Sequence, residues 1–313
     1  MTFARVARLS LVPLVLFAFA AGAEADEISG TITSTWTIHE DSRLVGDVTC
    51  LVENAPCISF GAPDITLRLE GFTITGRAEP PANCATPAAF VPEDGVSDVG
   101  HHNVSIIGPG LVQKFRRHGI FLNAASGISV RRLTSNHNCF SGLLMGGVSN
   151  SEIVENVSVR NGIASEQLPC GGNCITNSHN NVILRNVFGG NGSVTGSAGN
   201  NDFGAGLVGT SSGNLLQENA ITGNSNGILI QAATHSNVIR RNIVAGNPPV
   251  QVSKDYGAAI GFDIRDFAPA GMNTFEENLC LTYSGLEVPA PCPSLPSKVS
   301  GHRNAPPGHS KKP

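Results

Sequence analysis

A short motif recurs along most of this chain and constrains its fold more than any other feature. The motif is a serine or asparagine, a few mainly apolar residues and a second asparagine, in segments 151–157, 181–187, 214–220, 237–243 and 273–279. Segments 103–107 and 127–131 fit it more loosely. If Val104, Ile128, Glu152, Val182, Leu215, Val238 and Thr274 are equivalent, the steps are 24, 24, 30, 33, 23 and 36 residues. The basic unit therefore has about 23 residues and carries insertions.

A unit of this length cannot bury its apolar residues alone. It contains two or three very short strands, separated by asparagines such as Asn161, Asn191, Asn224 and Asn247 and by glycines such as Gly119, Gly142, Gly206 and Gly227. Stacked units can bury them, because each strand pairs with its equivalent about 4.8 Å along the axis. Asparagine suits the bends, since it tolerates left-handed backbone and its amide can bond to the next unit. The pattern predicts an all-β parallel β-helix. A leucine-rich repeat would need a regular leucine consensus, and a β-propeller would need tryptophan-aspartate blade signals.

The repeat resembles the right-handed parallel β-helix of the pectin-lyase-like superfamily. The likeness lies in the Asn-apolar-apolar-x-(Glu/Arg)-Asn motif, and segment 65–76 is similar to an opening coil of those proteins. It spans residues 42–285 and implies a single-stranded, right-handed solenoid with an N-terminal cap and lateral loops. The superfamily includes lyases, hydrolases, epimerases, tailspikes, adhesin-like proteins and a maturation factor, so the resemblance implies no single activity.

Both ends of the chain differ from the repeats. Arg5 and Arg8 precede an apolar run and small residues, a pattern typical of a signal peptide. We predict a signal peptide at 1–25, a cap at 26–49 in which Trp36 covers the ladder, a β-helix at 50–288 and a disordered tail at 289–313. No other apolar run approaches the ~20 residues of a membrane span. We therefore expect an exported protein, periplasmic or extracellular.

The cysteines and the net charge restrict the classes of partner. Eight cysteines in an exported chain indicate disulfides, with connectivity left open. Three pairs are close in sequence: Cys50 and Cys57, Cys170 and Cys174, and Cys280 and Cys292. This leaves Cys84 and Cys139 as a candidate long-range pair. Cys170 and Cys174 also have ligand-like spacing, but no second pair completes a zinc pattern, so we expect no metal and no cofactor. The net charge of −4 gives no indication of nucleic-acid binding.

Four insertions, 77–94, 162–173, 192–205 and 248–258, occur at the same place in the unit and should project from one edge. Between the first two, short connections form a notch that holds Lys114, Arg116, Arg117, His118 and His137. Basic side chains suit carboxylates, so we expect an acidic polysaccharide as partner. A lyase or epimerase acting on uronic acids would use Arg116 or Lys114 to neutralise the carboxylate and His118 or His137 as base. Arg117 and Asp94 are candidate substrate-binding residues.

Simpler interpretations compete with this site. His137 aligns with the turn slot that holds Asn161 in a later unit, and the basic residues fit a solvated turn. Asp94, His118 and Ser141 should form one column, but we expect no catalytic triad, because side chains in a parallel ladder point the same way. The alternative function is a non-catalytic carbohydrate-binding or surface-structural β-helix.

A second notch should present Asp202, Asn226, Asp255 and Tyr256, with Asn224 and Lys254 nearby, as a sugar-binding surface. Asp202 and Asp255 across this gap would suit glycoside hydrolysis. A calcium-dependent lyase site would need clustered carboxylates. The strand residues expected to point outward, Ser97, Phe121, Leu144, Thr176, Val208 and Leu229, include no acid before Asp263. A role in copper handling would need a cluster of soft ligands, which this sequence lacks.

Overall fold

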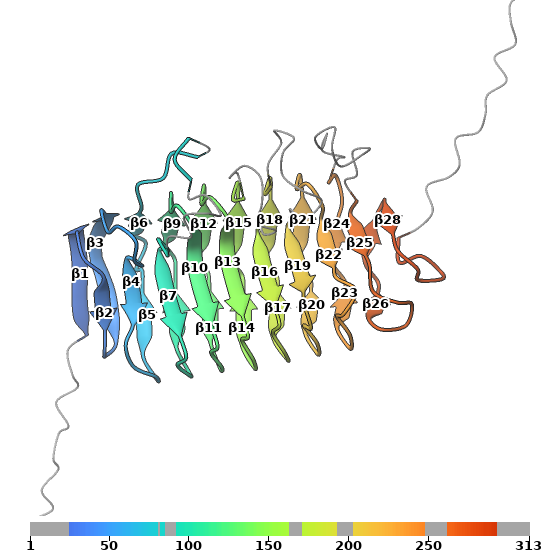
Figure 1. Ribbon diagram of the computed structural model, residues 1–313, viewed down its shortest axis with the longest axis horizontal. Coiled ribbons are helices and arrows are strands. Elements are labelled where there is room, and N and C mark those ends of the chain that lie inside the picture. The colour runs from blue at the N-terminus through green and yellow to red at the C-terminus, as the bar shows by residue number, and fades with distance from the viewer. Residues whose placement is uncertain are drawn as a thin grey trace, which may run out of the picture.

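The computed structural model describes residues 25–80, 82–84, 92–162, 171–192, 203–247 and 262–292. Its strands stack along one long axis from β1 to β28 (Figure 1), and every strand pairing runs parallel. This is a right-handed parallel β-helix, which confirms the predicted fold. The described residues include no helix long and apolar enough to cross a membrane.

Each complete coil contributes one strand to each of three faces. The first and second faces belong to one sheet of 18 strands, and the third face is a sheet of ten. The first face holds β5 (Thr66–Arg68), β8 (Ser105–Ile107), β11 (Ser129–Arg131), β14 (Glu152–Val154), β17 (Val182–Leu184), β20 (Leu215–Gln217), β23 (Val238–Arg240) and β26 (Thr274–Glu276). The second face holds β6 (Thr73–Thr75), β9 (Leu111–Gln113), β12 (Thr134–Asn136), β15 (Val157–Val159), β18 (Val187–Gly189), β21 (Ala220–Thr222), β24 (Ile243–Val244) and β27 (Leu279–Cys280).

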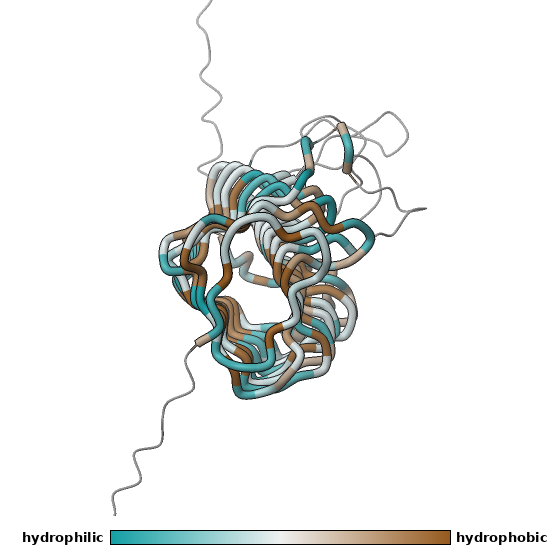
Figure 2. The backbone as a smooth tube through the Cα atoms, turned by 90° about the vertical axis from the view of Figure 1, so that its left-hand side faces the viewer, coloured by the Kyte–Doolittle hydropathy of each residue, from teal (hydrophilic) through white to brown (hydrophobic). Residues whose placement is uncertain are grey.

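The third face completes the coil. It holds β2 (Trp36–Ile38), β4 (Ile58–Phe60), β7 (Val96–Val99), β10 (His118–Asn123), β13 (Ser141–Gly146), β16 (Asn173–Thr176), β19 (Ala205–Val208), β22 (Ile228–Ile230), β25 (Ile264–Asp266) and β28 (Tyr283–Ser284). The two long strands β1 (Asp26–Ile32) and β3 (Ser42–Cys50) pair with each other, and β3 continues to both β5 and β6. The coils overlie one another when viewed end on (Figure 2).

The core lies inside the coils. In most three-residue strands only the middle residue is buried, as strand geometry requires when one side faces the lumen. On the first face these middle residues form a continuous apolar column, Leu67, Ile106, Val130, Ile153, Ile183, Leu216 and Ile239.

The register of the first face corrects one predicted equivalence. Glu152 pairs with Ser129, and Ser129 pairs with Ser105, so Ile128 and Val104 each lie one residue too early. The N–H of Ile128 instead donates to Ser151 Oγ, at the position that later coils give to asparagine. An apolar residue thus occupies a turn slot in the early coils. Because a shift of one residue exchanges the two sides of a strand, only the pairing reveals this slip.

Buried asparagines form three ladders along the corners, as the repeat predicted. In a typical rung, Asn186 Nδ2 donates to the Ile153 carbonyl (2.8 Å) and to Asn219 Oδ1 (3.0 Å). Its Oδ1 accepts from the backbone N and the Nδ2 of Asn156. The ladders comprise Asn181, Asn214, Asn237 and Asn273; Asn156, Asn186, Asn219, Asn242 and Asn278; and Asn138, Asn161, Asn191, Asn224 and Asn247.

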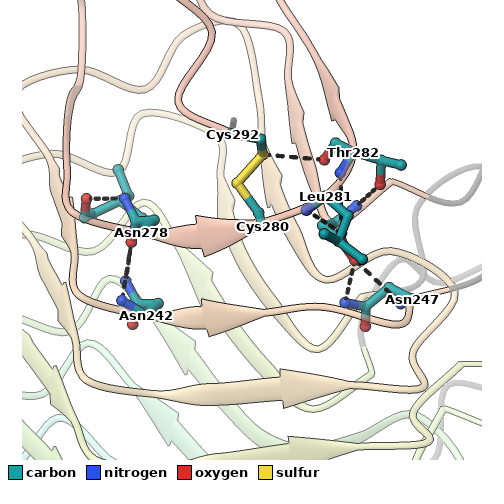
Figure 3. The surroundings of a disulfide bond; sticks show 9 residues. Asn242, Asn247, Asn278, Cys280, Leu281, Thr282 and Cys292 are labelled. Atoms are coloured by element: carbon teal, nitrogen blue, oxygen red, sulfur yellow. Dashed lines mark hydrogen bonds between the residues drawn. A yellow bond between two sulfur atoms is a disulfide. The ribbon is translucent and has the colours of Figure 1, made fainter. Parts of the chain in front are cut away.

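The third ladder ends on a carboxylate. Asp263 Oδ1 accepts from the N and Nδ2 of Asn247, and its Oδ2 accepts from the backbone N of Leu281 and Thr282. A terminal rung needs only acceptors, which a carboxylate supplies. The disulfide between Cys280 and Cys292 lies beside this end (Figure 3).

Three disulfides fall within the described residues. They join Cys50 to Cys57, Cys84 to Cys139 and Cys280 to Cys292, as the sequence spacing suggested. Cys174 is also disulfide-bonded, while Cys170 lies outside the described residues. The metal interpretation of Cys174 is therefore wrong.

The two ends of the β-helix can be compared with the segments predicted for the N-terminal cap and the tail. Trp36 pairs with Ile58 and is the first residue of an inward column that continues through Val96 and Ile120. The boundary expected after residue 49 falls inside β3, so residues 26–49 belong to the same sheets as the later coils. Residues 1–24 and 293–313, which include the predicted signal peptide and most of the tail, lie outside the described residues.

Candidate functional site

The first notch holds paired charges where the sequence suggested an open basic floor. Arg116 Nη1 lies 3.0 Å from Glu93 Oε1, and Arg116 Nε donates to the Asn83 carbonyl (2.8 Å). Arg77 also binds Glu93 (2.9 Å) and reaches Glu53. Two guanidinium groups therefore converge on one buried carboxylate.

Glu93 stays ionised in this setting. Burial alone would raise its pKa, but hydrogen bonds from Arg77 and the Asn54 N–H, together with the nearby Arg116, lower the pKa below its usual value. Arg77, Glu93 and Arg116 line a small, partly open recess. Arg116 is half-buried, and its Nη2 forms no hydrogen bond within the described chain.

A second, more deeply buried pair lies next to the first. Arg117 Nε donates to Asp94 Oδ1 (2.9 Å), and both side chains are almost fully covered. The backbone N–H of His118 donates to the same oxygen (3.1 Å). Burial raises the pKa of Asp94 to about 7, although Arg117 and the His118 N–H act in the opposite direction. The Arg117 guanidinium also lies 4.2 Å from the centre of the Phe121 ring.

Asp94, His118 and Ser141 occupy the predicted column, and the side chains of His118 and Ser141 also contact each other. His118 pairs with Ser141 in the sheet, and its Nδ1 lies 2.6 Å from Ser141 Oγ. This is one end-on contact between side chains of a parallel ladder, which otherwise point the same way. These residues do not form a triad, because Asp94 accepts from the backbone N–H of His118 and does not bind the imidazole ring. Ser141 is also fully buried.

His118 is poorly placed for proton transfer. Burial and the charge of Arg117 lower its pKa well below the usual value, and the ring packs against Phe121 and Phe140. Within the described chain, no hydrogen bond connects His118 with Lys114 or Arg116. The structure thus does not join these three predicted residues into one unit, and their catalytic roles stay predictions.

Lys114 and His137 instead share another column with Arg160. These three residues directly follow strands β9, β12 and β15, which pair in register, and all have left-handed backbone, with φ of 58°, 52° and 54°. We call Lys114, His137 and Arg160 the basic column. Glycine occupies the equivalent position before it, at Gly76, and after it, at Gly190, Gly223 and Gly246.

This placement corrects the predicted slot of His137. Asn138 is the residue that joins the asparagine ladder, through bonds from its N and Nδ2 to Asn161 Oδ1. His137 therefore lies one residue outside the ladder, half-buried at the corner. Sequence reasoning missed Arg160; the available signal was its position immediately before Asn161, which matches that of His137 before Asn138.

The basic column is not neutralised by acidic side chains. In the parts of the chain that the structure describes, neither Lys114 nor Arg160 forms an ion pair, in contrast to Arg116 and Arg117. Partial burial, followed by the charges of Arg160 and Lys114, lowers the pKa of His137 below its usual value. A neutral imidazole at neutral pH thus lies between two exposed cations.

The second notch falls largely outside the described residues, because Asp202, Lys254, Asp255 and Tyr256 are not among them. Asn226 is described and buried, and its Oδ1 accepts from the Phe262 N–H (3.4 Å). Asn224 belongs to an asparagine ladder. The hydrolytic interpretation therefore stays a prediction.

The outward positions of the third face differ in part from those predicted. The central outward column is Ser97, Phe121, Leu144, Cys174, Gly206, Leu229 and Arg265, whereas Thr176 and Val208 lie two residues further along their strands. Asp263 is not on this surface, because it ends the asparagine ladder. Among the described residues, no three His, Cys, Asp or Glu side chains group around a metal position.

Comparison with known proteins supports the fold. A family model described as "Right handed beta helix region" matches residues 95–263, which is 169 of the 313 residues. No curated protein matches the sequence significantly. Full-length tailspike protein 2 from Escherichia coli O157:H7 bacteriophage CAB120 aligns with a TM-score of 0.50 and 12% identity, over 82% of this chain and 35% of that one.

Alginate lyase from Paenibacillus sp. strain FPU-7 aligns with a TM-score of 0.48 and 13% identity, over 82% of this chain and 98% of that one. At 12% identity the tailspike shows a shared fold alone, and this chain spans only 35% of its length. The family match covers more than half of the sequence and coincides with the stacked coils. The chain therefore belongs to the right handed beta helix family.

Proposed function

We propose that this protein is exported and binds an acidic polysaccharide along the basic column. The observation that carries the proposal is a set of three basic residues on successive coils that have no acidic partner among the described residues. Equivalent positions in a parallel stack repeat about every 4.8 Å, so the column runs along the solenoid axis. A polymer with regularly spaced carboxylates could contact several of its members at once.

The cost of the basic column supports a binding role. Non-glycine residues in the left-handed region cost on the order of 1 kcal/mol each, and glycine occupies the same corner elsewhere. Lys114 and Arg160, two coils apart, also repel each other weakly. Basic side chains at a corner where other coils have glycine favour a surface that meets an anionic ligand. The half-buried Gln113, next to Lys114, offers an amide group for sugar hydroxyls.

The disulfides support export. Such bonds persist in oxidising compartments and are rare in the cytosol. The periplasm and the extracellular space both meet this condition, and both expose a protein to polysaccharide.

Replacing Lys114 and Arg160 together with alanine should weaken binding to polygalacturonate or alginate roughly tenfold at low salt, since each exposed contact contributes about 0.5–1 kcal/mol. Isothermal titration at two salt concentrations measures this, and the salt dependence should fall in parallel. A matched control replaces Arg68 and Arg240, which removes the same charge from the first face. Equal losses in both double variants would argue against the basic column.

His137 favours a second candidate function, a lyase or epimerase acting on uronic-acid glycans. Its lowered pKa keeps the imidazole neutral and able to accept a proton near pH 7, while Lys114 and Arg160 would neutralise the sugar carboxylate. In this scheme His137 replaces the buried His118 as base. Arg116, whose Nη2 forms no hydrogen bond within the described chain, would assist in binding the carboxylate.

His137→Asn should reduce such activity by about 100-fold or more, because asparagine tolerates the left-handed backbone but cannot act as base. The wild-type rate should fall only as the pH drops through the lowered pKa of His137, below the ordinary value of 6.5. Ultraviolet absorbance of unsaturated products and proton exchange into the glycan would report the two reactions. If the wild type binds glycan and neither signal appears, the protein is a binder only.

A further inference from the structure

The outer surface of the second face carries an exposed apolar stripe. One outward position in each strand forms the column Thr134, Val157, Val187, Ala220, Ile243 and Leu279. Val187 is 39% exposed, Ile243 56% and Leu279 53%. The next outward column, Asn136, Val159, Gly189 and Thr222, also has no charge. A continuous apolar surface of this kind marks an interaction site.

A column of alternating charge borders the stripe. At the corner between the first and second faces, the residue after each first-face strand is exposed and has left-handed backbone. Along six successive coils these residues are Arg132, Glu155, Arg185, Glu218, Arg241 and Glu277. Within the chain two ion pairs form, Arg185 with Glu155 (3.3 Å) and Arg241 with Glu277 (2.7 Å).

An alternating column of six charges is complementary to its own reverse. If a second copy lies antiparallel, Arg132 faces Glu277, Glu155 faces Arg241 and Arg185 faces Glu218 of the other copy. The same twofold axis places Val187 opposite Ala220 and Val157 opposite Ile243 of the other copy. The apolar stripes of the two copies therefore pack against each other. The short side chains let two sheets pack about 10 Å apart, with the long charged side chains at the rim.

We propose that the second face is a homodimer interface, in which two copies pack antiparallel about a twofold axis between the Val187 and Ala220 coils. Such a contact is isologous, the commonest form of symmetric assembly. The basic column does not meet itself in this arrangement, since Arg160 faces Gly246 of the other copy. The antiparallel dimer therefore does not bring the basic columns of the two copies together.

A parallel dimer fits less well. A twofold axis along the solenoid would place Arg132 opposite His137 and Arg185 opposite Gly190, and only Glu155 would meet an opposite charge, at Arg160. The alternation of Arg and Glu would then have no counterpart in the partner. Charge complementarity thus selects the antiparallel arrangement.

Sedimentation velocity of the purified chain over a concentration series should show a monomer–dimer equilibrium. Ile243→Lys should weaken the dimer on the order of 100-fold, because it buries an unpaired charge in the stripe. Val99→Lys, at a site 52% exposed on the third face, is the matched control and should leave association unchanged. A monomer at every concentration, or equal effects of the two variants, would overturn the proposal.

Charge reversal and cross-linking test the orientation. Glu218→Arg should weaken the dimer, and adding Arg185→Glu should restore most of the loss, because the pair at the axis forms again with opposite polarity. Treatment of a mixture of Val187→Cys chains and Ala220→Cys chains with a short bismaleimide, which spans the gap between two packed sheets, should cross-link one variant to the other. Cross-linking of Val187→Cys chains to themselves would indicate the parallel dimer and contradict the antiparallel one. Melting temperatures close to wild type verify that the variants fold.

Discussion

Asn186→Ala should lower the free energy of unfolding by roughly 4 kcal/mol, because it leaves several buried groups without partners. The wild-type side chain receives the N and Nδ2 of Asn156 and donates to the Ile153 carbonyl and to Asn219 Oδ1. Each orphaned group costs about 1–3 kcal/mol, and water cannot replace these bonds inside the solenoid. Equilibrium unfolding in urea measures the loss.

Asn123→Ala provides the control for that experiment. Asn123 ends β10, is only half-buried, and its side chain forms no hydrogen bond within the described chain, so its loss should change stability by about 0.5 kcal/mol or less. Asn186→Asp should be as harmful as alanine, because a carboxylate would face Asn219 Oδ1. An acid succeeds only at Asp263, where the ladder ends on donors. Similar stabilities of Asn186→Ala and Asn123→Ala would mean that the ladders contribute little.

Removal of the disulfide between Cys84 and Cys139, by changing both residues to alanine, should cost about 4 kcal/mol. These cysteines are separated by 55 residues, so the cross-link removes a large amount of loop entropy from the unfolded chain. The bond also holds Asn83, whose carbonyl accepts from Arg116, against the notch. Thermal and urea unfolding under non-reducing conditions measure the change.

The pair Cys50 and Cys57 offers an internal comparison, since only seven residues separate them. Its removal should cost about 2 kcal/mol, because a shorter loop loses less entropy when closed. The order of the two effects is therefore diagnostic. A larger loss for Cys50 and Cys57 would mean that native contacts around those residues outweigh chain entropy.

The fold was predictable because its determinants repeat. Each coil needs asparagine at the same corners, and the spacing of Asn156, Asn186, Asn219 and Asn242 reports the coil length directly. The repeat was hardest to align where the signal changes, at Val104 and Ile128, since an apolar residue there takes the turn slot. Only the strand pairing resolved that slip.

The candidate site was less predictable, because charge pairing depends on neighbouring coils and insertions. The sequence placed Arg116 and Arg117 in one notch but could not show that Glu93 and Asp94 reach them. It also grouped Lys114 with His118, whereas the turn after β9 directs them to different columns.

The sequence by itself determined the parallel β-helix and its asparagine corners, because periodicity encodes contacts between equivalent residues. The tertiary structure alone decided which cations remain unpaired. That outcome depends on side chains that approach across coils 23 or more residues apart, such as Arg117 and Asp94. Burial and opposite charge neutralise those groups, while Lys114, His137 and Arg160 lie at a corner where no described residue supplies an acidic partner, which makes them the surface that we propose for a ligand.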